Sequence, residues 1–492
     1  MEESPPSTEP TSSLESSARR RQRSTFRDFA IRNVWIVGYL ALQAFAVAGL
    51  VTPRFVDSQG YLHLSFTGTA DRLFTVPLLY TLLPTDPLRV AGQVLLATVA
   101  WWVLASTAAS FVFHRWLRLG LRLVLLALGL TGPIISWNST ILSESAAISL
   151  TALLIAAWLA YVRSPSRPLA AIGVLVTLLW TFVRQDQVIL CALIAAVAVV
   201  IAIRHRRPRT NIAVAVLLVA ISVLGFVSSD RNHSAIDVSI ADIVQGRILT
   251  NPSYLAWFQA HGMPYTSTMA KAAGGYPATP LLHDPTFDPW LIDHGEATYI
   301  EFVLAHPRYA LWEPLADVGG EPSSLSTQTT SPTPTLQPEP TPSLLSPTVA
   351  YGRHRQVLPT VIEIFLFEQG QIGDLVVLIT ATGAVMFVLW RRRALSRIDV
   401  VPGIVVLSAV PQFYAVWLGD LLELDRHAMV LAVSFRIGLW TLLAFGLDRL
   451  LLDRERGIPM WSTARPPRSR NRHQFPGARS GAGAQPSEPA PE

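Results

Sequence analysis

About ten long apolar runs divide the chain, and shorter polar stretches separate them. Each run is long enough, or nearly so, to cross a bilayer as a helix, and the third and fifth are the shortest. Hydrocarbon offers no partner to an exposed backbone group, so runs of this length are predicted to be helical. The pattern predicts an all-α polytopic membrane protein. The predicted spans lie at about 33–52, 88–113, 119–136, 144–162, 168–183, 187–203, 211–228, 373–390, 399–418 and 428–450.

Arginines set the predicted orientation of these spans. An arginine-rich stretch precedes the first run, and four later loops carry arginines without any acidic residue. Because Lys and Arg concentrate in cytoplasmic loops, both termini are predicted to be cytoplasmic and residues 229–372 to lie outside. The first run is followed by Val51-Thr52-Pro53-Arg54, which lacks a small-x-small cleavage pattern, and this favours a retained anchor. The four loops contain Arg115, Arg118 and Arg122; Arg163 and Arg167; Arg204, Arg206, Arg207 and Arg209; and Arg391, Arg392, Arg393 and Arg397.

Composition agrees with the membrane class and excludes others. Half of the 492 residues are hydrophobic (50%), only 15% are charged, and the mean hydropathy is +0.37, which is too apolar for a soluble multidomain protein. The net charge of +5 does not indicate nucleic-acid binding, because the arginines mark span ends and form no basic face with interleaved aromatics. The single cysteine, Cys191, lies in an apolar run and can form no internal disulfide.

The polar stretches predict the organisation around the spans. Residues 1–32 and 452–492 are predicted to be disordered cytoplasmic tails. Residues 33–228 hold seven helices and a first outer loop at 53–87, and residues 373–451 hold three more helices. The outer loop 229–372 contains aromatic and amphipathic stretches that predict a small ordered subdomain, with a Ser-, Thr- and Pro-rich disordered insertion at 321–348.

Nearly every carboxylate close to a span falls on the predicted outer side. Asp57 lies early in the first outer loop, which also contains Arg72. Glu144 ends an aromatic and polar turn and opens the fourth span, and Arg184 follows the fifth. Carboxylates contribute little to orientation, so their gathering on one side is an independent indication of a site there. The last outer turn, before the tenth span, contains Glu423, Arg426 and His427.

In this order, these residues resemble the GT-C superfamily of membrane glycosyltransferases, which use polyprenyl-phosphate sugars as donors. The resemblance includes His306-Pro307-Arg308-Tyr309 in the large loop and spans about 33–451. It implies a protein-mannosyltransferase-like or arabinosyltransferase-like enzyme that passes a sugar, such as mannose or arabinose, to a cell-envelope glycan, lipid or protein hydroxyl on the outer face. Asp57 lacks the second acid of the Asp-x-Asp or Asp-Glu pair of many members, which leaves a requirement for a divalent metal open.

The chemistry of glycosyl transfer assigns expected roles. A carboxylate takes the proton of the acceptor or stabilises an oxocarbenium-like transition state, and cations hold the phosphate leaving group. Asp57 and Glu144 are therefore the predicted catalytic residues. No metal ligands are assigned, no cofactor is expected to be required, and the expected partners are the lipid-linked donor, the acceptor and the bilayer. The predicted substrate-binding residues are Arg72, Arg184, Glu423, Arg426, His427 and Arg436.

Each assignment has a structural alternative. Asp57 could be an ordinary turn residue, Glu144 could only cap the fourth span, and Arg184 could only anchor the fifth at the headgroups. Arg436 lies roughly three turns inside the tenth span, where a lipid-facing guanidinium is costly, so it pairs with Asp425 or binds the donor phosphate.

Two further questions stay open at this level. Residues 283–296 collect His, Asp and Glu in a spacing that matches no closed metal site and favours a solvated loop. The alternative functions are a transporter of lipids or lipid-linked sugars, which needs polar positions through to the cytoplasmic side, and a catalytically inactive scaffold.

Overall fold

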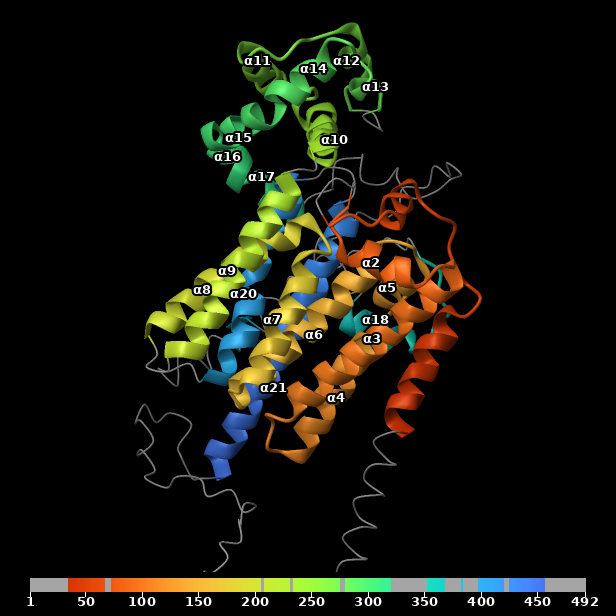
Figure 1. Cartoon of the computed structure of the whole chain (residues 1–492), viewed down its shortest axis with the longest axis vertical. Helices are drawn as coiled ribbons and strands as arrows, with labels where there is room; N and C mark the ends of the chain where they lie inside the picture. The colour runs from red at the N-terminus through yellow and green to blue at the C-terminus, as the bar shows by residue number, and fades with distance from the viewer. Residues whose placement is uncertain are drawn as a thin grey trace, which may run out of the picture.

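The computed structural model describes residues 34–66, 72–204, 208–230, 233–274, 279–319, 352–367, 382–383, 397–419 and 424–455. Within these ranges the regular structure is helical and no strand occurs. The predicted tail 1–32, residues 456–492 of the second predicted tail, the insertion at 321–348 and nearly all of the predicted span at 373–390 lie outside them. Residues 452–455, predicted to belong to the second tail, instead continue the last helix. Figure 1 shows the long helices side by side, with a group of short helices above them.

The long helices follow the apolar runs of the sequence. A helix over Val34–Val47 comes first. Proline in the first turn begins α3 and α7, where its missing N–H leaves no hydrogen bond unmade, and Ser166 caps α7. The others are α3 (Asp86–Ala109), α4 (Arg115–Leu128), α6 (Glu144–Arg163), α7 (Arg167–Thr181), α8 (Gln185–Arg204), α9 (Pro208–Asp230), α20 (Arg397–Gly419) and α21 (Leu424–Glu455).

Five helices are long and apolar enough to cross a membrane: Asp86–Ala109, Glu144–Arg163, Thr210–Ser229, Asp399–Gly419 and Arg426–Glu455. A sixth is possible if the bent pair Arg115–Leu128 and Gly132–Ser139 forms one broken span. The helices at the first, fifth and sixth predicted spans are shorter: Val34–Val47, Arg167–Thr181 and Gln185–Val200. The described residues therefore contain five or six candidate spans and not ten.

The predicted span at 119–136 is interrupted, because the helix breaks within it. The helix α4 ends at Leu128, and the chain turns by 53° before α5 (Gly132–Ile135). Pro133 has no N–H to donate to the carbonyl four residues before it, and Thr131 has an extended backbone, so the helix breaks before α5. A Cβ on Gly129 would lie 2.6 Å from the Trp101 ring, so glycine also allows the close contact with α3 at this point.

Shorter elements connect and cover the long helices. In Figure 1 the helices α10 to α17 form the group at the top, and their apolar side chains share a buried cluster with α20 and α21. The bounds are η1 (Val56–Ser58), η2 (Gly60–Leu62), α2 (Thr75–Leu82), η3 (Ser136–Ser139), α10 (His233–Ile243), η4 (Val244–Ile248), α11 (Pro252–Ala260), α12 (Ser267–Ala272), α13 (Thr279–Leu282), α14 (Phe287–Trp290), η5 (Leu291–Gly295), α15 (Glu296–Ala305), α16 (Pro307–Leu311), α17 (Glu313–Gly319) and α18 (Thr360–Leu366).

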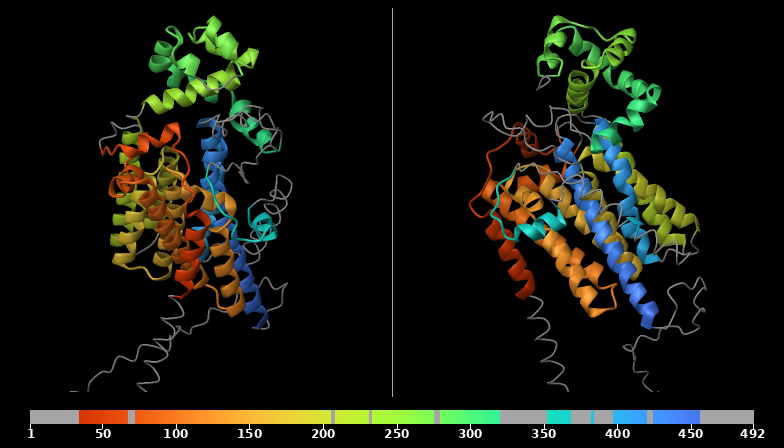
Figure 2. Two further views of the ribbon diagram at one scale, coloured as in Figure 1. Left: turned by 90° about the vertical axis from the view of Figure 1, so that its right-hand side faces the viewer. Right: turned by 180° about the vertical axis from the view of Figure 1, so that it is seen from behind.

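The segment 352–367, which includes α18, packs along the side of the long helices (Figure 2). The guanidinium of Arg355 donates to the carbonyls of Phe45 and Ala48 at 2.9 and 2.8 Å. Farther along, Glu363 accepts a hydrogen bond from the backbone N–H of Gly132. The segment therefore links the helix over Val34–Val47 to the break between α4 and α5.

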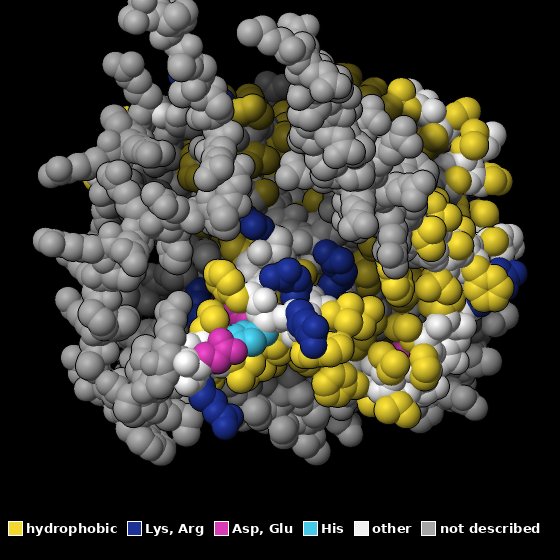
Figure 3. All heavy atoms as spheres, turned by 90° about the horizontal axis from the view of Figure 1, so that it is seen from below, with side chains coloured by type: hydrophobic (Ala, Val, Ile, Leu, Met, Phe, Trp, Pro, Cys, Tyr) yellow, Lys and Arg dark blue, Asp and Glu magenta, His cyan; other side chains and the backbone are white. Residues whose placement is uncertain are grey.

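The face opposite the short helices carries arginines among hydrophobic side chains (Figure 3). The helices α4 and α7 begin with arginine, and α6 ends with one. Asp448, near the end of α21, accepts hydrogen bonds from the backbone N–H groups of Phe113 and His114. This contact fixes the turn before α4 to the last helix.

Candidate active site

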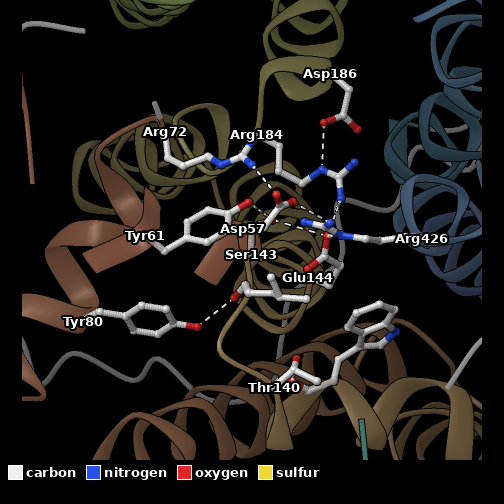
Figure 4. A network of polar contacts seen from close by, with 12 residues as sticks. Asp57, Tyr61, Arg72, Tyr80, Thr140, Ser143, Glu144, Arg184, Asp186 and Arg426 are labelled. Carbon is white, nitrogen blue, oxygen red and sulfur yellow. Dashed lines mark hydrogen bonds and ion pairs between the residues drawn. The ribbon is translucent and has the colours of Figure 1, made fainter. Parts of the chain in front are cut away.

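Four charged side chains from distant parts of the sequence meet in one cluster (Figure 4). Asp57 lies on η1, Glu144 is the first residue of α6, Arg184 lies between α7 and α8, and Arg426 is in the first turn of α21. Arg426 donates from Nη1 to Asp57 Oδ2 at 2.8 Å and from Nε to Glu144 Oε1 at 2.6 Å. One guanidinium thus joins both predicted catalytic carboxylates.

Glu144 is the centre of this cluster and has no exposed surface (0%). Besides Arg426, it accepts a hydrogen bond from Arg184 Nη1 at 3.0 Å. Arg184 in turn donates from Nε to Asp186 Oδ1 at 2.9 Å. A buried carboxylate is costly unless it is paired, and here two guanidiniums compensate it. In this arrangement Glu144 holds the two arginines and is closed to a substrate.

Asp57 is the more accessible carboxylate, with 32% of its side chain exposed. Its Oδ1 lies 3.1 Å from Arg72 Nη2, and Figure 4 shows it between Arg72 and Arg426. Partial burial would raise the pKa of Asp57, but the charges of Arg426 and Arg72, together with that of His427, outweigh burial and lower the pKa. Asp57 is therefore ionised at neutral pH and available to a ligand.

Local hydrogen bonds hold Asp57 in place. The backbone N–H of Phe55 donates to Ser58 Oγ at 2.9 Å, and the N–H of Ser58 donates back to the carbonyl of Phe55 at 3.0 Å, which closes a tight turn around Asp57. The hydroxyl of Tyr61 donates to Ser143 Oγ at 3.0 Å. The first loop is thereby fixed to the residue that precedes Glu144.

A buried polar network supports the turn before Glu144, and the sequence analysis did not identify it. Asn138 Nδ2 donates to Gln43 Oε1 at 3.0 Å, Gln93 Nε2 donates to the carbonyl of Thr140 at 2.8 Å, and the hydroxyl of Tyr80 donates to the carbonyl of Leu142 at 2.7 Å. The signal was present, since Gln43 and Gln93 interrupt apolar runs, where polar residues are costly unless partnered.

Arg436 does not join the cluster. It lies ten residues after Arg426, about 15 Å farther along the helix. Its guanidinium donates to the carbonyls of Leu366 and Phe367 at 3.0 Å each and lies 4.3 Å from the centre of the Phe367 ring. Arg436 thus attaches the end of α18 to α21. The alternative partner, Asp425, has a side chain that the structure does not describe.

The other predicted residues have different outcomes. Glu423 lies outside the described residues, so its assignment stays a prediction. In the His306–Tyr309 element, Tyr309 is fully buried, and its ring centre lies 5.1 Å from that of Trp417 on α20. This element joins the short helices to α20. Among the described residues no group of three or more His, Cys, Asp or Glu is arranged to hold a metal ion.

The cluster combines three carboxylates, of Asp57, Glu144 and Asp186, with three guanidiniums, of Arg72, Arg184 and Arg426. The formal charges of these six groups therefore balance. A phosphate could replace a carboxylate on the guanidiniums, because both groups accept charge-assisted hydrogen bonds in the same geometry. Such an exchange is easiest at Asp57 and Arg72, because this ion pair is the most exposed of the cluster.

Comparisons with known proteins identify no family for this chain. No protein-family model matches the chain, and no curated protein matches its sequence.

Proposed function

We propose that this chain is an integral membrane glycosyltransferase of the GT-C type. It transfers a sugar, such as mannose or arabinose, from a polyprenyl-phosphate donor to a cell-envelope glycan, lipid or protein hydroxyl on the outer face of the cell membrane. The observation that carries the proposal is the contact of Arg426 with both Asp57 and Glu144, because it joins three distant segments at one carboxylate and guanidinium site.

In the proposed reaction, the donor phosphate binds Arg72 and Arg426 and takes the place of the Asp57 carboxylate. Asp57 then accepts the proton of the acceptor hydroxyl, and the acceptor oxygen forms a bond to the anomeric carbon. The bond between that carbon and the phosphate oxygen breaks, and polyprenyl phosphate leaves with its new negative charge held by the arginines. Release of Asp57 from its ion pairs raises its basicity when the substrate is present.

Glu144 has a positioning role in this proposal. It contacts both Arg184 and Arg426, and it cannot receive the acceptor proton unless these two ion pairs open. Asp57, with a third of its side chain exposed and no comparable enclosure, is the base.

The proposal includes ten membrane spans, cytoplasmic termini and an outer subdomain formed by residues 229–372. Five or six apolar helices of sufficient length support the membrane class. The arginine distribution of the loops supports the orientation, which puts Asp57 and Arg426 on the extracytoplasmic side.

A comparison of cell-envelope glycans tests the proposal. Cells that lack the protein should lose one sugar or linkage from the extractable glycans, lipids or glycoproteins. The wild-type gene should restore it, and an Asp57→Asn variant expressed at the same level should not. Restoration by Asp57→Asn would refute the catalytic assignment and favour the transporter alternative, which requires no base.

A further inference from the structure

The short helices α16 and α17 present a face that is exposed among the residues that the structure describes. The N–H of Trp312 donates to the carbonyl of Arg308, and the N–H of Ala316 to that of Trp312, both at 2.9 Å, so the helical path continues across the junction. Arg308, Leu311, Trp312 and Leu315 therefore lie on one face, at the spacing i, i+3, i+4 and i+7. Trp312 is 67% exposed and Leu311 54%. We call these four residues the Trp312 face.

The same segment is attached to a candidate membrane span. The hydroxyl of Tyr414 on α20 donates to the carbonyl of Leu311 at 3.1 Å. Tyr414 lies five residues before the end of α20 at Gly419, which is about 7 Å along the helix. The backbone that carries the Trp312 face thus lies beside the last turns of α20 and not beyond its end. Figure 1 shows α17 at the upper end of α20.

The exposed surface of α20 continues this face. Val410 and Leu407, four and seven residues before Tyr414, lie on the same side of the helix and are 58% and 71% exposed. If α20 spans the membrane, these side chains face lipid, and the Trp312 face lies where the lipid tails give way to the headgroups. Tryptophan and basic residues are enriched at this level, because the indole is amphipathic and the guanidinium pairs with lipid phosphate.

We propose that the Trp312 face inserts into the headgroup region of the leaflet at which α20 ends. Leu311 and Leu315 contact the upper acyl chains, the Trp312 indole lies at the headgroup level, and Arg308 pairs with lipid phosphate. Tyr309 and Tyr299 connect the segment to Trp417 and Leu418 on α20, so insertion fixes the short helices relative to the bilayer. This inference does not depend on the proposed catalytic activity.

Site-directed fluorescence quenching tests the proposal on the full chain. Cys191 is the only cysteine and is buried, so Cys191→Ser gives a background for Leu311→Cys and Leu315→Cys, each labelled with a small environment-sensitive fluorophore. The proteins are placed in nanodiscs of phosphatidylcholine and phosphatidylglycerol. Quenching is measured with a lipid that carries a nitroxide near the headgroup and with aqueous iodide. Val410→Cys is the lipid-facing control, and Ala256→Cys, exposed on α11, is the water-facing control.

At both test positions the nitroxide lipid should quench the fluorescence at least half as strongly as it does at Val410. Iodide should quench it several-fold less than it does at Ala256. Iodide quenching equal to that at Ala256 would place the face in water and overturn the proposal. Protection from both quenchers would also overturn it, because the face would then be covered by protein, either another segment of this chain or a second copy. Agreement between the two test positions guards against a local effect of one label.

Discussion

Replacement of Glu144 by glutamine should destabilise the protein markedly. The change keeps the size of the side chain but removes the carboxylate charge that both the Arg184 and the Arg426 guanidiniums contact. Loss of one partner from a buried ion pair costs about 3–5 kcal/mol, because the remaining charge is left uncompensated. Each arginine keeps a second carboxylate, Asp186 or Asp57, so we expect a free energy of unfolding lowered by about 3 kcal/mol, at the lower end of that range.

The assay is thermal unfolding of the purified full chain in detergent or nanodiscs, followed by intrinsic tryptophan fluorescence. Glu301→Gln is the matched control, because Glu301 is an exposed glutamate on α15 whose contact with His261 is 3.9 Å long. The same chemical change at that surface position should alter the free energy of unfolding by less than about 0.5 kcal/mol. Glu144→Gln should lower the melting temperature by several degrees and leave some transfer activity in the folded fraction.

Two results would refute this reasoning. Equal melting temperatures for Glu144→Gln and Glu301→Gln would show that the buried ion pairs do not stabilise the fold. Normal stability combined with complete loss of transfer would make Glu144 a catalytic residue instead of a positioning residue.

Other variants separate the proposed base from the phosphate-binding groups. Asp57→Asn should lower turnover by about two to four orders of magnitude and leave donor binding at least as tight, because no carboxylate then competes with the phosphate; near-normal transfer would exclude Asp57 as the base. Arg426→Gln should weaken donor binding about tenfold or more through loss of a charge-assisted contact, measured by titration with a polyprenyl-phosphate sugar; unchanged affinity would exclude phosphate binding by Arg426. Arg72→Gln removes a charge that lowers the pKa of Asp57, so the acidic limb of the pH profile of kcat/KM should move to higher pH. An unchanged limb would show that it does not report the ionisation of Asp57. In the Cys191→Ser background, Ser326→Cys should react with a membrane-impermeant thiol reagent in intact cells, whereas protection would invert the proposed topology.

The lowered pKa of Asp57 also makes the stability of the protein depend on pH. Arg426 and Arg72 hold the folded-state pKa of Asp57 below its unfolded value despite partial burial. The stabilisation from these ion pairs is therefore present above the ordinary carboxyl range and is lost as the pH falls through the lowered pKa.

The hydrophobic pattern of the sequence predicted the helices well but not the break between α4 and α5. Helix formation follows from the length of an apolar run, and the structure has a helix at every predicted span that it describes. The bend before Pro133 depends on backbone hydrogen bonding within an otherwise apolar run, which hydropathy does not register. Length was also overestimated for the first span, which was predicted at 33–52 but whose helix ends at Val47.

For the site, the sequence indicated which charges to examine but not their pairing. The outer-loop pattern singled out Asp57, Glu144, Arg184 and Arg426, and the structure brings these four together; their functional roles stay predictions. The contacts of Arg436 with the carbonyls of Leu366 and Phe367 depend on how a segment seventy residues away packs, which no local pattern encodes.

Single-turnover transfer with purified protein tests the central proposal most directly. Wild-type protein and Asp57→Asn are reconstituted in nanodiscs and supplied with polyprenyl-phosphate donors carrying labelled mannose or arabinose, together with envelope extract as acceptor. The proposal predicts that the wild type converts one donor into free polyprenyl phosphate and a labelled product, whereas Asp57→Asn binds the donor and forms product at least a hundredfold more slowly. Binding of the donor without formation of product by either protein would contradict the proposed enzyme.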